Sequence, residues 1–131
     1  MYPNTFYRVS VKALIRDEGG RVLVMKENQD TWSLPGGGLN HGEYAIDGVR
    51  RELKEELDID DANINEVFCV KTLNLVDKKA WFMWIVYKVK LNDINFHFGD
   101  GVTEVQFMDP ELLSSSDDIF EKMVYEVATE K

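Results

Sequence analysis

The chain is poor in cysteine and has no long apolar run. Cys69 is the only cysteine among the 131 residues, which excludes an intramolecular disulfide and a cysteine-based zinc cluster. No apolar run is long enough to span a bilayer. The opening residues, MYPNTFYRVSVKAL, lack the basic start and the continuous apolar core of a signal peptide. We therefore expect a cytoplasmic protein with no membrane partner.

Positive charge is also scarce. The 15 Lys and Arg residues are outnumbered by 24 Asp and Glu residues, so the formal net charge is −9. Most of such a surface would repel the phosphates of nucleic acid and of anionic lipids. We therefore expect no nucleic-acid partner, although a small anionic ligand held through metal ions is compatible with this charge.

The hydrophobic pattern predicts a single domain, residues 1–131, of the α/β class. Apolar alternation predicts strands, the first two joined as a hairpin, over residues 5–17, 21–27, 63–76, 79–91 and 103–109. Helical periodicity predicts helices over about 44–57 and 117–131. No linker or repeat separates these elements. Their order predicts a mixed β-sheet with helices packed on its faces.

The first predicted helix has two distinct faces when its residues are placed about 100° apart. The face expected to pack on the sheet contains Ile46, Val49, Leu53 and Leu57. Another sector contains Ala45, Gly48, Glu52, Glu55 and Glu56. Neighbouring like charges cost a few tenths of a kcal/mol per pair, and a glycine inside a helix costs roughly 1 kcal/mol. Both costs fall on the sector that combines small residues with carboxylates.

Two interpretations of this acidic sector are open from the helix alone. A solvated acidic stripe is common in proteins. A site for Mg²⁺ or Mn²⁺ is the alternative, because these ions prefer oxygen ligands and would convert the repulsion into attraction. The turn formed by Gly36, Gly37 and Gly38 lies just ahead of the helix and lets the backbone approach a ligand closely. This combination favours the metal site.

The segment from Gly37 to Ile59 resembles the Nudix box, G-x5-E-x7-R-E-U-x-E-E-x-G-U, where U is a bulky aliphatic residue. Gly37, Glu43 and the run RELKEELDI at 51–59 fit every position but one. The lead-in WSLPGG is also typical of the family. Asp58 stands where the family has a glycine that ends the helix in a left-handed conformation. Asp tolerates that conformation better than most residues, so we expect a small stability effect and intact chemistry.

The resemblance implies an α/β/α sandwich that hydrolyses a nucleoside diphosphate linked to another group, with Mg²⁺ or Mn²⁺ as cofactor. It implies metal ligands at Glu52, Glu55, Glu56 and the carbonyl of Gly36. The catalytic set would be Arg51, Glu52, Glu55 and Glu104, with Arg51 orienting a carboxylate through charge-assisted hydrogen bonds. The substrate-binding set would be Gly37, Gly38 and Glu43, and Glu43 would also stabilise the junction between loop and helix.

The general base is open among these residues. Some family members use a later glutamate, and the segment DGVTEVQFMD around Glu104 resembles the part of the chain that supplies it. An ordinary surface glutamate is an equal alternative for Glu104, and Asp100 is a weaker candidate.

Two other functions are compatible with a Nudix fold. A noncatalytic nucleotide-sensing module would bind the ligand without cleaving it, but the intact Glu52, Glu55 and Glu56 oppose this interpretation. An isomerase of an isoprenoid diphosphate is disfavoured by the short chain. The expected partner is a small nucleotide diphosphate derivative whose identity the sequence leaves open. Dimers are common in the family, so a homodimer is an open prediction.

Overall fold

The computed structural model describes residues 6–28, 30–76, 79–93, 95–99 and 101–130. The elements are β1 (Tyr7–Leu14), β2 (Val22–Glu27), β3 (Gly36–Gly38), α1 (Ala45–Leu57), β4 (Ala62–Leu75), β5 (Ala80–Leu91), β6 (Val102–Met108), the 3-10 turn η2 (Pro110–Leu113) and α2 (Ile119–Thr129). Both predicted helices are confirmed. In the described ranges, no helix is long and apolar enough to cross a membrane.

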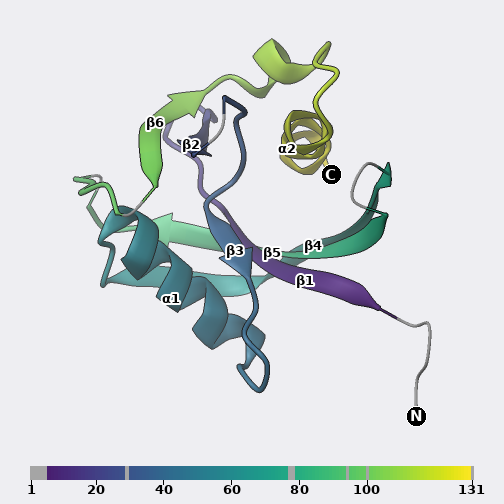
Figure 1. The fold of residues 1–131 in the computed structure, drawn as a ribbon. Helices are drawn as coiled ribbons and strands as arrows, with labels where there is room; N and C mark the ends of the chain where they lie inside the picture. Colours follow the sequence, from purple (N-terminus) through teal and green to yellow (C-terminus); the bar gives the residue numbers. More distant parts are fainter. Residues whose placement is uncertain (1–5, 29, 77–78, 94, 100, 131) are drawn as a thin grey trace.

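The central sheet is mixed, as the sequence predicts. Its strand order is β3-β1-β5-β4, in which β1 and β5 are parallel and the other pairs are antiparallel. A second sheet pairs β2 with β6. Figure 1 shows α1 and α2 on opposite sides of the central sheet. The α/β class with a sheet between helices is therefore confirmed.

The predicted hairpin between the first two strands forms, but it is short. Beyond the turn, antiparallel pairing is limited to the bridge between Arg16 and Val22 and to the hydrogen bonds from the Asp17 N–H to the Arg21 carbonyl and from the Leu23 N–H to the Ile15 carbonyl, both 2.9 Å. Both edges of β1 are already paired, one with β3 and the other with β5. The chain therefore turns at Gly19 and Gly20 and leaves the central sheet, and β2 finds its partner in β6.

Two cores cover the two faces of the central sheet because side chains alternate along each strand. The core beneath α1 includes Val11, Ala13, Val49, Leu53 and Leu57. The core beneath α2 includes Leu14, Trp84, Val86, Val124 and Val127. Fully burying one such Val or Leu side chain contributes about 1.5–3 kcal/mol. Ile46, predicted to face the sheet, is instead 39% exposed in the first turn of α1.

The three glycines form a strand rather than the expected turn. Gly36, Gly37 and Gly38 pair with Lys12, Val11 and Ser10 of β1. Gly36 has a φ of 133°, and a Cβ there would collide with the carbonyl oxygen of Val11. A Cβ at Gly37 would lie 2.8 Å from Oε1 of Glu52. Glycine therefore lets β3 pass between β1 and the carboxylates of α1.

Asp58 ends α1 in the predicted left-handed conformation, with φ 55° and ψ 38°. Its backbone N–H donates to the carbonyls of Leu53 and Lys54. Its carboxylate accepts a hydrogen bond of 2.6 Å from Lys54 Nζ and lies 3.1 Å from His97 Nδ1. The hydrogen bond from Lys54 lowers the pKa of Asp58. Asp thus replaces the glycine of the box without changing how the helix ends.

Candidate active site

Four glutamates meet at one cavity beside α1. The cavity has a volume of about 330 Å³ and is lined by Glu27, Glu52, Glu55, Glu56 and Gly99. The helix repeat places Glu52, Glu55 and Glu56 on neighbouring turns, and β2 supplies Glu27 at its last position. The structure therefore brings together the three glutamates predicted from the helix pattern and adds a fourth.

Glu56 is the buried member of this group. Its side chain is 3% exposed, and Oε1 accepts a hydrogen bond of 2.8 Å from the Gly36 N–H. Oε2 is buried and has no hydrogen-bond partner among the described residues. Burial, followed by the negative charge of Glu27, raises the pKa of Glu56 to about 9. A buried polar atom without a partner is unusual in a folded protein and indicates a bound ion or water.

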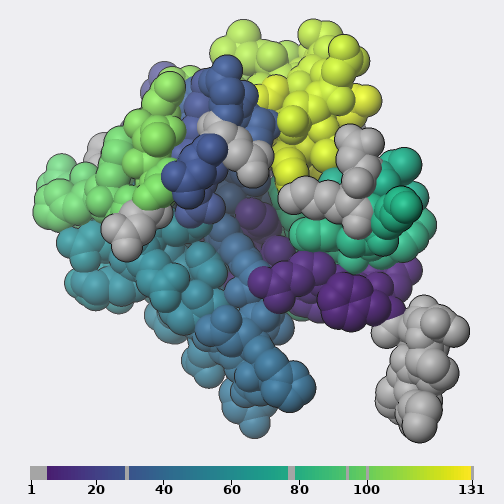
Figure 2. Space-filling view, viewed as in Figure 1, coloured from purple at the N-terminus to yellow at the C-terminus, as the bar shows by residue number. Residues whose placement is uncertain are grey.

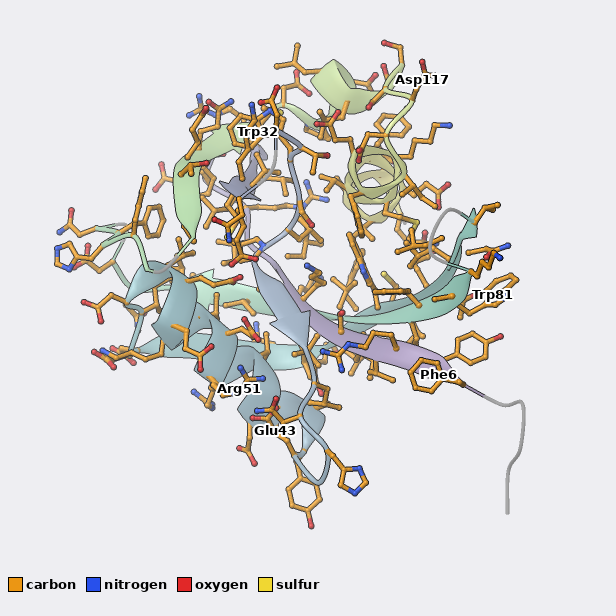
Figure 3. All side chains as sticks on the ribbon, viewed as in Figure 1. Phe6, Trp32, Glu43, Arg51, Trp81 and Asp117 are labelled. Carbon is orange, nitrogen blue, oxygen red and sulfur yellow. The ribbon has the colours of Figure 1, made fainter. Side chains whose placement is uncertain are left out.

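The Arg51 side chain connects the loop, β3 and α1 through hydrogen bonds. Figure 3 shows its guanidinium beside Glu43. Nε donates to Glu43 over 2.8 Å, Nη1 donates to Glu52 over 2.9 Å and to Glu55 over 3.2 Å, and Nη2 donates to the Gly38 carbonyl over 3.0 Å. The planar fork of arginine suits several simultaneous acceptors. The orientations of Glu52 and Glu55 thus depend on one side chain.

Glu43 lies at the junction between the loop and α1. Its Oε1 accepts hydrogen bonds from Arg51 Nη2 over 3.0 Å and from the Asn40 N–H over 3.1 Å. The hydrogen bond from Arg51 lowers the pKa of Glu43. These contacts place Glu43 at the junction, and its roles in stabilising the junction and in binding substrate stay predictions.

Glu52 and Glu55 each have one carboxylate oxygen that is available to bind a ligand. Arg51 engages Oε1 of Glu52 and Oε2 of Glu55, and the remaining oxygen of each has no hydrogen bond within the described ranges. The Glu52 side chain is 12% exposed and that of Glu55 is 59% exposed. Burial raises the pKa of Glu52. One half-buried and one exposed carboxylate therefore flank the buried Glu56.

The donor set fits a hard divalent cation, which prefers carboxylate and carbonyl oxygens. The free Oε2 of Glu56 is the strongest sign of this fit. Among the described residues, the Gly36 carbonyl accepts one side-chain hydrogen bond, a long one of 3.4 Å from Lys12 Nζ. No three acidic, histidine or cysteine side chains in this part of the chain already surround a single point. Binding would therefore require the glutamate side chains to move toward the ion.

Glu104 lies apart from the glutamate cavity. It sits on β6 opposite Lys26, with its carboxylate 3.9 Å from Lys26 Nζ and its side chain 57% exposed. The lining of the glutamate cavity does not include it. Its catalytic role stays a prediction, and Asp100 lies outside the described residues.

Glu27 was not predicted from the sequence. It ends an ordinary strand, and a charged residue at a strand end is usually a surface residue. It faces α1 because β2 leaves the central sheet to pair with β6. A local pattern does not reveal such a long-range pairing.

A mixed sheet between two helices, with glutamates of one helix packed against a glycine strand, defines an α/β protein with a candidate cation site. The NUDIX domain family model matches residues 6–126, and the chain belongs to this family. It is similar to the MutT protein from Methanosarcina mazei Go1, with a TM-score of 0.79, 22% identity and coverage of 97% of this chain and 96% of that one.

Two curated relatives are named RNA pyrophosphohydrolase. The protein from Ruthia magnifica subsp. Calyptogena magnifica is 42% identical over 52 residues, covering 39% of this chain and 29% of that protein. The protein from Pseudomonas fluorescens (strain SBW25) is 32% identical over 66 residues, covering 50% of this chain and 42% of that protein. The chain thus spans less than half the length of these relatives.

Proposed function

We propose that the protein is a Mg²⁺- or Mn²⁺-dependent pyrophosphohydrolase that cleaves a nucleoside diphosphate linked to another group. The observation that supports this function most is the buried, unpartnered Oε2 of Glu56 in a cavity lined by four glutamates. Membership of the NUDIX family supports it independently. We also propose that the chain forms a single domain, because β1 and β5 contribute side chains to both cores.

Each residue of the site has a proposed role. Glu52, Glu55, Glu56 and the Gly36 carbonyl would hold the cation, and Glu27 would add negative charge beside it. When bound, the cation would neutralise phosphate oxygens and lower the pKa of the attacking water. A carboxylate accepts the proton of that water, and we propose Glu52, Glu55 or Glu104 as this base.

The residues around β3 would position the substrate. The backbone of Gly37 and Gly38 has no side chain to keep a phosphate away. Arg51 would hold Glu52 and Glu55 in place, and Glu43 would hold Arg51 through the hydrogen bond of 2.8 Å. A cytoplasmic location and a homodimer remain predictions.

The test is a phosphate-release screen with Mg²⁺, with Mn²⁺ and with EDTA. The substrates are nucleoside triphosphates, nucleotide sugars, ADP-ribose, dinucleotide cofactors and dinucleoside polyphosphates. Glu56→Gln should abolish most metal-dependent turnover and leave the fold intact, because an amide of the same shape replaces the carboxyl group that would bind the cation. Glu126→Gln is the matched control, since Glu126 is an exposed helical glutamate. Wild-type turnover by folded Glu56→Gln protein would defeat the assignment.

A short RNA with a 5′-triphosphate belongs in the same screen because of the names of the two relatives. The net charge of −9 opposes RNA as a substrate, so we expect small nucleotides to be cleaved faster. Binding of a nucleotide without cleavage anywhere in the panel would support the sensing module instead.

A further inference from the structure

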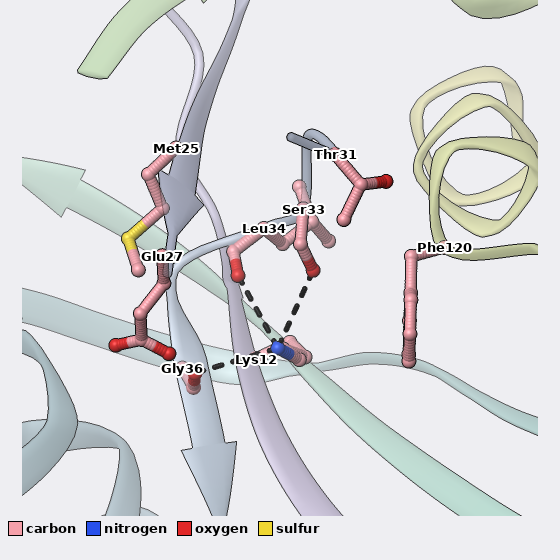
Figure 4. A pocket seen from close by; sticks show the side chains of 8 residues that line it. All are labelled: Lys12, Met25, Glu27, Thr31, Ser33, Leu34, Gly36 and Phe120. Atoms are coloured by element: carbon pink, nitrogen blue, oxygen red, sulfur yellow. Dashed lines mark hydrogen bonds between the residues drawn. The ribbon is translucent and has the colours of Figure 1, made fainter. Parts of the chain in front are cut away.

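A second cavity lies directly beside the glutamates. Its volume is about 140 Å³, and it is lined by Lys12, Met25, Glu27, Thr31, Ser33, Leu34, Gly36 and Phe120. Figure 4 shows the Lys12 amine between the β2 side of this cavity and Phe120 of α2. In Figure 2 the surface between the blue segment and the yellow α2 is recessed, with purple β1 atoms at the bottom. We call this space the lysine cavity.

The lysine cavity adjoins the glutamate cavity. Glu27 lines both of them. Gly36 lines the lysine cavity, and its N–H is hydrogen-bonded to Glu56 over 2.8 Å. A group attached to a diphosphate at the glutamates would therefore reach the lysine cavity next.

Lys12 is a buried cation with weak partners. Its side chain is 9% exposed, and Nζ lies 3.5 Å from Ser33 Oγ, 3.3 Å from the Leu34 carbonyl and 3.4 Å from the Gly36 carbonyl. These distances exceed the usual value of about 2.9 Å. Among the described residues, Lys12 forms no salt bridge. The three N–H donors of Lys12 thus have only long hydrogen bonds to the protein, and Nζ also lies 4.9 Å from the centre of the Trp84 ring. A carbonyl oxygen in the cavity would offer Lys12 a shorter hydrogen bond.

The size and walls of the lysine cavity suit one flat six-membered ring, either a pyrimidine or the six-membered ring of a purine. A cavity of about 150 Å³ is large enough for benzene. Phe120 supplies an aromatic wall and is held in place by Trp84, whose ring is 6.2 Å away and nearly parallel, at 11°. Met25 lies on the other side in Figure 4. Thioether and aromatic walls favour a planar ring over a sugar.

We propose that Lys12 selects nucleotides whose base presents a carbonyl oxygen, as in uracil and hypoxanthine, over those that present an amino group there. This inference rests on the proposed function for the position of the diphosphate. An amino group at the same position would place its N–H donors against those of Lys12, and two donors cannot form a hydrogen bond with each other. A site built around one hydrogen bond rejects the mismatched analogue strongly. Glu27 does not reverse this preference, because its exposed carboxylate remains solvated.

Two matched substrate pairs test the proposal. UTP differs from CTP, and ITP from ATP, in a carbonyl oxygen against an amino group and in the adjacent ring nitrogen, which carries a hydrogen in uracil and hypoxanthine and is an acceptor in cytosine and adenine. We expect kcat/KM with Mn²⁺ to favour UTP and ITP by about tenfold or more, which is about 1.4 kcal/mol. Lys12→Met should bring both ratios near one. Lys88→Met should keep them, since Lys88 also lies over an aromatic ring, Phe68, but is exposed on β5.

A binding measurement separates this proposal from the hydrolase proposal. Calorimetry of UMP against CMP in EDTA needs neither turnover nor metal, and Glu56→Gln should keep the preference for UMP. If the protein cleaves nothing in the panel but still prefers UMP, only the proposal of hydrolase activity is contradicted. A wild-type UMP to CMP ratio near one, or an unchanged ratio in folded Lys12→Met, would overturn the role of Lys12. Lys12→Gln, which keeps N–H donors and adds an acceptor, should give an intermediate ratio if Lys12→Met does not fold.

Discussion

Arg51 shows how one side chain organises several others. Its guanidinium reaches Glu43, Glu52, Glu55 and the Gly38 carbonyl. A lysine at this position would supply a single ammonium and could not reproduce the planar fork. The charge of the site would be unchanged, so a change in activity would report the loss of orientation.

We therefore predict that Arg51→Lys lowers kcat/KM and Mn²⁺ affinity by about 10–100-fold, the range typical of residues that orient metal ligands. Enzyme kinetics and Mn²⁺ titration measure the two effects. Arg50→Lys is the matched control, because Arg50 is an exposed neighbour with one long contact of 3.4 Å to the Ala62 carbonyl. Equal activity of the two variants would contradict the positioning role.

At the scale of elements, the end of α1 has the clearest energetic consequence. Asp58 holds the left-handed conformation, and its carboxylate binds Lys54 over 2.6 Å. We predict that Asp58→Ala lowers the free energy of unfolding by roughly 1 kcal/mol, since alanine tolerates this conformation poorly. Asp58→Gly should cost less, because glycine removes the strain while it loses the ion pair.

Urea unfolding of Asp58→Ala and Asp58→Gly measures this prediction, and kcat should stay at the wild-type value in both variants. A loss of activity in folded Asp58→Gly protein would show that Asp58 contributes to the site itself.

Local patterns predicted the elements better than their pairing. The 3.6-residue repeat identified α1 and α2, and the same repeat grouped Glu52, Glu55 and Glu56. It wrongly assigned Ile46 to the core, because a helical wheel says nothing about where the partner sheet ends. The glycines at 36–38 were expected in a turn, since glycine is common in turns and the space it leaves between β1 and Glu52 arises only from tertiary packing.

At the scale of the whole molecule, the long-range pairing of strands determines which side chains lie at the site. The mixed sheet and its two helices followed from the order of elements. The departure of β2 from β1 did not, and that departure brings Glu27 to the glutamates. The burial of Lys12 also follows from tertiary structure, because an isolated strand pattern places a lysine at the surface.

The candidate site also affects the stability of the whole fold. The pKa of Glu56 rises from 4.5 to about 9 on folding, mainly because of burial. The unfolded chain therefore releases this proton at a lower pH than the folded protein does. The contribution of Glu56 is fully present below pH 4.5 and is lost as the pH rises toward 9. The buried Lys12 acts in the opposite sense below pH 10.5, since burial lowers its pKa.

We predict that the metal-free protein melts at a lower temperature at pH 8 than at pH 6, and that Glu56→Gln reduces this dependence. One proton is worth at most about 1.4 kcal/mol per pH unit. The slope should not vanish, because burial also raises the pKa of Glu52. Thermal melts in EDTA measure the effect, and Glu126→Gln should retain the wild-type slope. Parallel pH profiles for wild type and Glu56→Gln would mean that Glu56 is already ionised in the folded protein, and the unpartnered Oε2 would then require a cation at neutral pH even before substrate binds.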